Sequence, residues 1–79
     1  MVGRIVAYIL VNVLAGTEED VRDEILSRFG GKVTEARITY GEFDIVVRVE
    51  VENMRILEAI VSGIRSISGV ERTVTLVAT

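Results

Sequence analysis

The sequence predicts an α+β fold of the order βαββαβ, the ferredoxin-like arrangement in which two helices cover one face of a four-stranded antiparallel sheet. Short segments rich in β-branched residues alternate with two amphipathic segments, and glycines separate several of them. The two halves of the chain also repeat one strand–helix–strand spacing. Because right-handed crossovers place both helices on one side, and 79 residues leave no room for a second core, we expect one domain over residues 1–79.

The first half opens with a continuous apolar run over residues 5–11, which is short and β-branched and therefore predicts a strand. Thr17 follows a turn at Gly16 and is predicted to cap a helix whose first turn, residues 18–20, is acidic. Gly30-Gly31 is predicted to end that helix as a C-cap glycine. The helix presents apolar side chains at helical spacing: Val21, Ile25, Leu26 and Phe29.

A β-hairpin is predicted in the middle of the chain. Its strands cover about residues 32–40 and 43–51, and Gly41-Glu42 forms a tight connection between them. In the second strand, one set of alternate residues is uniformly apolar, which is typical of a strand that buries one face.

Asn53 is predicted to cap the second helix, which ends near Ser68-Gly69 and is followed by a last strand over about residues 70–78. The apolar positions of this helix are Leu57, Ile60, Val61 and Ile64, and Ile67 is a further candidate. Strand alternation predicts Val70, Val74 and Leu76 on one face of the last strand, and Thr73, Thr75 and Val77 on the other.

The first strand is apolar on both faces, although helices can cover only one. Its two sets are Val6, Tyr8 and Leu10, and Ile5, Ala7, Ile9 and Val11. The chain has no cysteine and no histidine, so neither disulfides nor the common soft metal ligands can stabilise so small a core. We therefore expect a homodimer with the open sheet faces together, a dimeric α/β-barrel-like assembly.

Composition excludes several function classes. The formal net charge is −3 and the basic residues are scattered, which argues against direct nucleic acid binding. No apolar run is long enough for a membrane span, so we expect a cytoplasmic protein. Without histidine, cysteine, a phosphate loop or zinc-ligand spacing, we expect no catalytic residues, no metal and no cofactor.

Two places carry groups that suit a small-molecule ligand. Gly41 can adopt a positive φ and expose backbone N–H groups, and Asp44 could bind an α-ammonium group. Thr73 and Thr75 share one strand face, and their hydroxyls could bind an α-carboxylate. Structural roles explain the same residues: Gly41 would make the turn, Asp44 would accept its hydrogen bonds, and threonine simply favours strands.

These residues resemble the C-terminal effector domain of the Lrp/AsnC transcription regulators, the RAM domain, named for regulation of amino acid metabolism. The hairpin motif Gly41-Glu42-Phe43-Asp44 precedes a valine-rich strand, residues 45–49, as in that family. The second similar segment is Ile67-Ser68-Gly69-Val70, which leads into Thr73-Val74-Thr75. The hairpin of this chain has Phe43 where tyrosine is commoner.

The resemblance implies dimers with facing sheets, rings of such dimers, and amino acid effectors bound where dimers meet. By this resemblance, the residues expected to lie next to the ligand are Gly41, Glu42, Phe43 and Asp44, with Thr73 and Thr75 as candidates from the strand nearby. Family regulators also carry an N-terminal helix-turn-helix domain, whereas this chain begins at the first strand of the effector domain. We therefore expect a stand-alone amino acid sensor, or a partner that co-assembles with full-length Lrp/AsnC paralogues.

Three alternatives remain at this point. An ACT-type regulatory domain shares the βαββαβ order, and its ligand turn would correspond to Ala15-Gly16. A small dimeric α/β-barrel enzyme has the same fold, although the absence of histidine argues against it. A purely structural assembly module would need no ligand.

Overall fold

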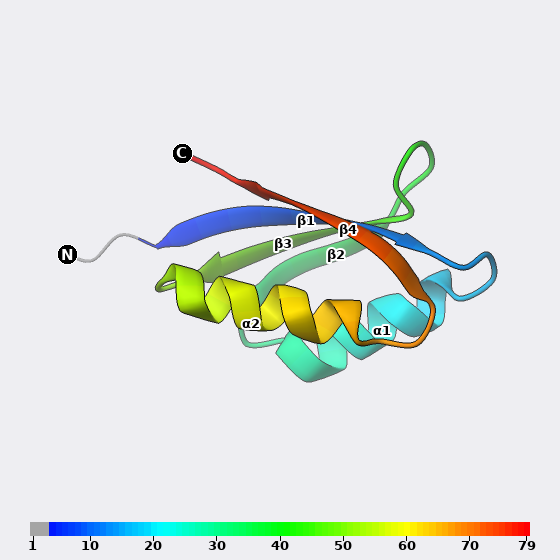
Figure 1. Cartoon of the computed structure of the whole chain (residues 1–79), viewed down its shortest axis with the longest axis horizontal. Coiled ribbons are helices and arrows are strands. Elements are labelled where there is room, and N and C mark those ends of the chain that lie inside the picture. Colours follow the sequence, from blue (N-terminus) through cyan, green and yellow to red (C-terminus); the bar gives the residue numbers. More distant parts are fainter. Residues whose placement is uncertain (1–3) are drawn as a thin grey trace.

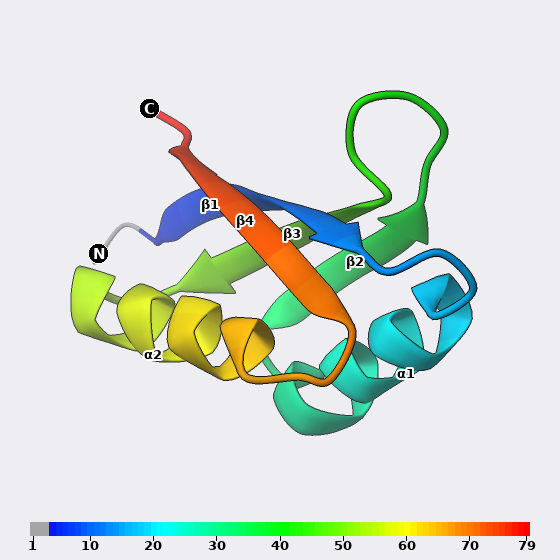
Figure 2. The same ribbon diagram turned by 45° about the vertical axis from the view of Figure 1, so that its right-hand side comes forward.

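The computed structural model describes residues 4–79 as a four-stranded sheet with two helices on one face (Figures 1 and 2). The elements are β1 (Ile5–Val13), α1 (Glu18–Phe29), β2 (Val33–Ile38), β3 (Ile45–Val51), α2 (Met54–Arg65) and β4 (Val70–Val77). The strand order is β2-β3-β1-β4 and every neighbouring pair is antiparallel. The predicted ferredoxin-like fold is confirmed. The first three residues of the predicted domain lie outside the described part.

The core lies between the sheet and the two helices. Alternate residues of the central strands point into it, so every second side chain of β1 from Ala7 and of β3 from Ile45 is buried. From the helices, the most deeply buried side chains are Val21, Ile25, Leu57 and Ile64. The largest fully buried side chains are all aliphatic, which gives the domain a core without buried polar groups among residues 4–79.

The face of the sheet opposite the helices is partly apolar, as the two-sided pattern of β1 predicts. The register pairs Tyr8 with Leu76 and Leu10 with Val74, so their side chains gather on this open face. Leu76 remains 52 % exposed. Charged side chains from β3 share the face, and Arg48 donates to Glu50 over 2.7 Å. The open face therefore combines an aliphatic stripe with an internally paired charge cluster.

A β-bulge in β4 corrects one predicted face. Asn12 pairs with Arg72, but Val13 pairs with Val70, so Glu71 has no partner in β1. The extra residue turns Val70 toward the helices, where it packs against the core. The sequence prediction placed Val70 with Val74 and Leu76, because strict alternation cannot anticipate an inserted residue.

The connection between β2 and β3 is longer than the predicted tight turn. β2 ends at Ile38 and β3 begins at Ile45, so residues 39–44 form a loop, called the 39–44 loop below. The Thr39 N–H donates to the Asp44 carbonyl over 2.9 Å and closes the base of the loop. The Asp44 N–H donates to the Val11 carbonyl, also over 2.9 Å, so Asp44 is attached to β1 as well.

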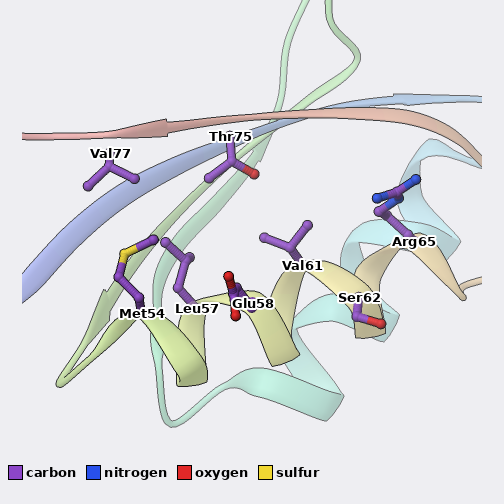
Figure 3. A pocket seen from close by; sticks show the side chains of 8 residues that line it. All are labelled: Met54, Leu57, Glu58, Val61, Ser62, Arg65, Thr75 and Val77. Atoms are coloured by element: carbon purple, nitrogen blue, oxygen red, sulfur yellow. The ribbon is translucent and has the colours of Figure 1, made fainter.

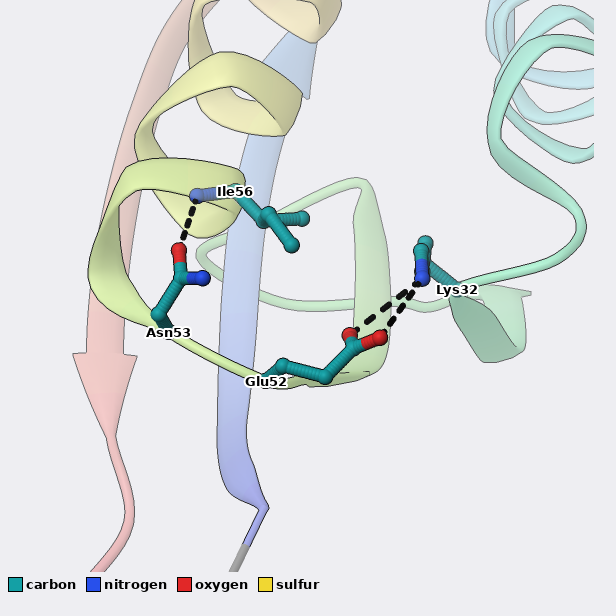
Figure 4. A network of polar contacts seen from close by, with 4 residues as sticks. All are labelled: Lys32, Glu52, Asn53 and Ile56. Atoms are coloured by element: carbon teal, nitrogen blue, oxygen red, sulfur yellow. Dashed lines mark hydrogen bonds and ion pairs between the residues drawn. The ribbon is translucent and has the colours of Figure 1, made fainter.

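The two helices begin differently. Asn53 caps α2 as predicted, since its side-chain oxygen accepts from the Ile56 N–H over 3.0 Å (Figure 4). Thr17 makes no side-chain cap to α1 and instead donates its hydroxyl to the Leu14 carbonyl over 2.6 Å. The Glu18 carboxylate accepts from the Gly16 N–H over 2.9 Å. The hydroxyl of Thr17 thus closes the preceding turn, which the local sequence pattern does not distinguish from capping.

α1 ends at Phe29 with Gly30 as its C-cap, so the predicted end of the helix is confirmed. Gly30 has φ −56°, however, and keeps the right-handed helical conformation instead of the left-handed one that is common at such a cap. Lys32 follows and forms an ion pair of 3.2 Å with Glu52, which joins the start of β2 to the end of β3 (Figure 4).

Across residues 4–79, neither helix has the length and apolar character needed to cross a membrane.

Candidate functional site

The Asn12 side chain is one of the groups that hold the 39–44 loop against the end of β1. Asn12 donates its amide to the Glu42 carbonyl over 2.8 Å and to Asp44 Oδ2 over 3.4 Å. Within the loop, the Thr39 hydroxyl donates to the Phe43 carbonyl over 2.7 Å. These bonds fix the backbone of a segment that has no regular secondary structure.

Asp44 satisfies a backbone donor at the end of β1. Its Oδ2 accepts from the Val13 N–H over 2.9 Å. Leaving such a donor unpaired in a half-buried position costs about 1–3 kcal/mol. Both side-chain bonds of Asp44 use Oδ2, so Oδ1 has no hydrogen-bond partner within residues 4–79. Asp44 therefore has a structural role and a carboxylate oxygen available to a ligand.

An acidic cleft lies between the 39–44 loop and the start of α1. Its volume is about 650 Å³. Gly41 lines it with φ +123°, a conformation that side chains other than glycine rarely adopt. The remaining lining residues are Gly16, Glu18, Glu19, Asp20, Ile38, Thr39, Tyr40 and Asp44. Four of the nine carry carboxylates and none is basic, so the cleft favours an ammonium group.

The predicted threonines lie elsewhere. Thr75 lines a groove of about 450 Å³ between α2 and β4 (Figure 3). Thr73 lines a smaller polar hollow beside Arg65 and Arg72. Within one chain, the six predicted residues are not brought into one site: Gly41 and Asp44 share the acidic cleft, and the two threonines are turned toward the helix side of β4.

The other two predicted residues flank the loop. Glu42 is exposed, and its backbone carbonyl, not its carboxylate, is the group that Asn12 binds. Phe43 is half-buried, and the guanidinium of Arg72 lies 5.4 Å from the centre of its ring, within cation–π range. Neither residue lines the acidic cleft in a single chain.

Within residues 4–79, two charged groups have shifted pKa values, and both lie outside the acidic cleft. The hydrogen bond to Glu50 raises the pKa of the Arg48 guanidinium on the open face. The hydrogen bond from Lys32 lowers the pKa of the Glu52 carboxyl. No cluster of three or more metal-ligating side chains occurs in the part of the chain that the structure describes.

Comparison with known families agrees with this architecture. The family model of the Lrp/AsnC ligand binding domain matches residues 6–79. The chain belongs to this family. Membership favours the Lrp/AsnC resemblance over the ACT-type alternative, and the family is one of transcription regulators.

A curated relative of this Lrp/AsnC domain is the HTH-type transcriptional regulator FL11 of Pyrococcus furiosus. The two are 32% identical over 73 residues, which cover 92% of this chain and 47% of FL11. The chain therefore spans about half the length of that relative.

Solved structures give the same fold for the Lrp/AsnC domain. The hypothetical protein PHS023 from Pyrococcus horikoshii is 32% identical with a TM-score of 0.84, and the match covers 95% of this chain and 89% of that one. TTHA0845 from Thermus thermophilus is 30% identical with a TM-score of 0.87, covering 95% and 92%. The regulator NMB0573 of Neisseria meningitidis, solved as a complex with L-Met, is 17% identical with a TM-score of 0.80, covering 95% and 49%, and shows the fold alone.

Sequence reasoning missed two residues that shape the site of this Lrp/AsnC domain. Asn12 is the one polar residue in the apolar run of β1, and this break in the pattern was the available signal. Arg72 had no comparable signal, because its position over Phe43 depends on the pairing of β4 with β1.

Proposed function

We propose that this Lrp/AsnC domain is an effector-binding and oligomerisation module in transcription regulation, and that its effector is an amino acid. The observation that carries the proposal is the free Oδ1 of Asp44 beside Gly41 in the acidic cleft. A carboxylate forms strong, charge-assisted hydrogen bonds with an α-ammonium group. The complex of NMB0573 with L-Met supports this ligand class by analogy, and the function as a regulator follows from the family.

The cleft of one chain suits the α-ammonium group of an amino acid but not its α-carboxylate. Its lining has four carboxylates but no basic side chain to bind an α-carboxylate. The backbone N–H groups near Gly41 supply partial positive charge, and a neighbouring protomer would supply the remaining contacts, with Glu42, Phe43, Thr73 and Thr75 as the candidates. This division suits an effector bound at a junction between dimers, as the family resemblance implies.

A homodimer through the open sheet face is the second part of the proposal. The stripe formed by Leu10, Val74 and Leu76 would remain in water in a monomer, and burial of apolar surface stabilises by about 25 cal/mol per Å². Facing sheets would cover the stripe in both copies at once. Further assembly into rings would bring the 39–44 loops of different dimers together.

Thermal unfolding in the presence of each of the twenty amino acids tests the effector. A ligand that binds only the folded state adds about 2.7 kcal/mol at a hundredfold excess over its Kd. We expect one or a few amino acids to raise the melting temperature, with the shift lost in Asp44→Asn. Asp23→Asn, which makes the same change at an exposed carboxylate outside the cleft, should retain it. A flat panel confirmed by calorimetry would contradict the effector proposal and leave a purely structural assembly role.

The regulatory role requires a DNA-binding partner if this domain itself contacts no DNA. We propose that it co-assembles with full-length Lrp/AsnC regulators through the same interfaces that join its own copies. Co-expression with a helix-turn-helix relative from the same cell, followed by native mass spectrometry, tests this. Mixed assemblies are the expected result, and complete sorting into separate species would contradict co-assembly.

A further inference from the structure

β4 is an edge strand, and the outer side of its backbone pairs with no strand in the described part of the chain. The Ala78 N–H donates to the Val6 carbonyl over 2.8 Å, which fixes which residues of β4 bond to β1. Because an antiparallel ladder alternates, the N–H and C=O groups of Thr73, Thr75 and Val77 point away from β1. Such an edge can pair with an added strand.

An apolar groove of about 450 Å³ lies between this edge and α2 (Figure 3). Leu57 and Val61 of α2 line it on one side, and Thr75 and Val77 of β4 line it on the other. Val77 is 46% exposed. In an added strand, the side chains opposite Thr75 and Val77 would lie on the same side of the sheet and cover this apolar surface.

One end of the groove is positively charged. Arg65 lies at this end, and it forms no ion pair with another side chain between residues 4 and 79 (Figure 3). Arg65 also lines the polar hollow at the start of β4, together with Arg72, Glu71 and Thr73. Two guanidinium groups and one carboxylate therefore border this end, which favours a carboxylate ligand through charge-assisted hydrogen bonds to Arg65.

The direction of β4 determines which end of an added strand meets Arg65. β4 starts at Val70, beside Arg65, and runs toward the apolar end of the groove, where Met54 and Val77 lie (Figure 3). A strand antiparallel to β4, like every other pair in this sheet, would therefore end at Arg65. The helix extends about 16 Å from Met54 to Arg65, so five strand residues span the groove.

Glu58 places a negative charge in the middle of the groove, below Thr75 (Figure 3). The Glu58 carboxylate, like the Arg65 guanidinium, forms no ion pair among the residues that the structure describes. A strand residue opposite Thr75 would direct its side chain toward Glu58. A basic side chain is favoured at this position.

We infer that this groove binds the extended C-terminal segment of a partner protein, with the terminal carboxylate at Arg65. The segment would run antiparallel to β4, with its last residue opposite Thr73. Its third residue from the end would be basic and lie opposite Thr75, and its fifth from the end would be apolar and lie opposite Val77. The groove shares no lining residue with the acidic cleft, so this binding does not depend on an effector.

Calorimetric titration of the whole chain with a short peptide tests the inference. The probe is acetyl-Thr-Val-Thr-Lys-Thr-Val with a free C-terminus, and the matched control is the same peptide with a C-terminal amide. We expect the acid to bind about tenfold more tightly than the amide, because the amide loses the charge-assisted bonds to Arg65. Equal affinities of acid and amide, or no binding of the acid, would overturn the inference.

Substitution of Arg65 tests where the carboxylate binds. Arg65→Gln should weaken binding of the acid and leave binding of the amide unchanged, so that the two peptides become equal. Arg55→Gln makes the same change at an exposed position of α2 outside the groove and should preserve the tenfold difference. A difference that persists in Arg65→Gln would contradict the assigned position of the carboxylate.

Substitution of Glu58 tests the preference for a basic residue. Glu58→Gln should lower the affinity for the lysine peptide and leave the affinity for a norleucine analogue unchanged. Equal losses for the two peptides would contradict the assigned register.

Peptides with a single N-methyl group test the strand pairing. N-methylation of the lysine removes the N–H that would pair with the Thr75 carbonyl, so binding should be lost. N-methylation of the next residue, whose N–H would point away from β4, should leave the affinity nearly unchanged. Equal effects of the two methyl groups would contradict pairing along β4.

Amide hydrogen exchange distinguishes this occupant from others. The amides of Thr75 and Val77 should exchange more slowly when the peptide is bound. Slow exchange that is already present without peptide and is lost on dilution would assign the edge to a second copy of the chain and overturn the inference. Slowed exchange confined to the 39–44 loop would overturn it as well.

Discussion

The acidic cleft and the groove between α2 and β4 are lined by different kinds of side chain. The cleft is formed by a loop and a helix start, and four of its nine lining residues carry carboxylates. The groove is formed by two regular elements and is walled by aliphatic and thioether side chains, with Glu58 and Arg65 spaced along it. The cleft offers positioned polar groups, and the groove offers a strand edge and apolar area.

This difference separates recognition of a small molecule from recognition of a chain. A loop can aim N–H groups and one carboxylate oxygen at a small ligand, provided that something holds the loop in place, and here Asn12 and Asp44 do so. A straight edge strand with repeated donors and acceptors matches another strand instead. A substitution in one of the two regions should affect that region and leave the other unchanged.

The largest effect is expected at Asp44. Asp44→Ala removes the acceptor of the Val13 N–H, and we expect the free energy of unfolding to fall by about 2 kcal/mol. It should also abolish effector binding, without changing peptide binding in the groove. Urea unfolding with Glu42→Ala as control checks this, because Glu42 contributes its carbonyl rather than its carboxylate. Equal stability of both variants would show that Asp44 does not hold the loop.

Gly41→Ala should cost about 1 kcal/mol or more, because φ is +123°. A Cβ at this position would meet no atom within 4 Å, so the cost arises from the backbone and not from crowding. Gly31→Ala is a control, since its Cβ would also meet nothing within 4 Å and no positive φ is involved. Thermal unfolding of the two variants measures the difference, and an unchanged melting temperature for Gly41→Ala would mean that the loop adopts another conformation.

Asn12→Ala and Asn53→Ala form a matched pair at opposite ends of the molecule. Each removes side-chain hydrogen bonds to the backbone and should destabilise by about 1 kcal/mol. Only Asn12→Ala loosens the 39–44 loop, so only it should lower the affinity for the effector. Calorimetric titration of both variants checks the expectation. Equal effector affinities of the two variants would show that the conformation of the 39–44 loop does not affect effector binding.

Val77→Ser should change the stability of the folded chain by no more than about 0.5 kcal/mol, because the side chain is half exposed. It removes apolar surface from the groove, so peptide binding along β4 should weaken while effector affinity remains. Calorimetric titration with the same peptide measures this binding. Unchanged peptide affinity would indicate that this end of the groove is not covered.

The smallest effect is expected at Glu52, whose pKa lies below its ordinary value of 4.5 because Lys32 donates to it. A lowered pKa stabilises the folded state above the pKa of the unfolded chain, and this stabilisation is lost as the pH falls through the folded-state pKa. Wild type should therefore slightly exceed Glu52→Gln in stability at pH 7, and the difference should vanish in acid and shrink in high salt. A difference that grows as the pH falls would contradict the assigned ion pair.

Most of the fold was predictable from the sequence because the elements have strong local signals. The burial alternation in β1 and β3, the Asn53 cap and the positive φ of Gly41 are confirmed. The extent of the hairpin turn, the face of Val70 and the role of Thr17 were predicted wrongly. These depend on contacts between distant segments: the bulge opposite Asn12 inserts a residue into β4, and β1 takes the ends of the 39–44 loop as partners.

The site was predictable only in part for the same reason. Gly41 and Asp44 line one cleft because they belong to one loop, which a local motif describes well. Thr73 and Thr75 share a strand face as expected, but a strand face does not specify which hollow it borders. Whether these threonines meet the loop depends on a second chain, so their part in the site remains a prediction.

The most direct test is an NMR titration in which the amino acid selected by the unfolding panel is added to 15N-labelled protein and the amide chemical shifts are recorded. We expect the amides of Gly41, Glu42 and Asp44 to shift in proportion to saturation, while those of Met54 and Val61 in the groove stay in place. Shifts confined to the groove, with the 39–44 loop unchanged, would contradict the assignment of the acidic cleft as the effector site.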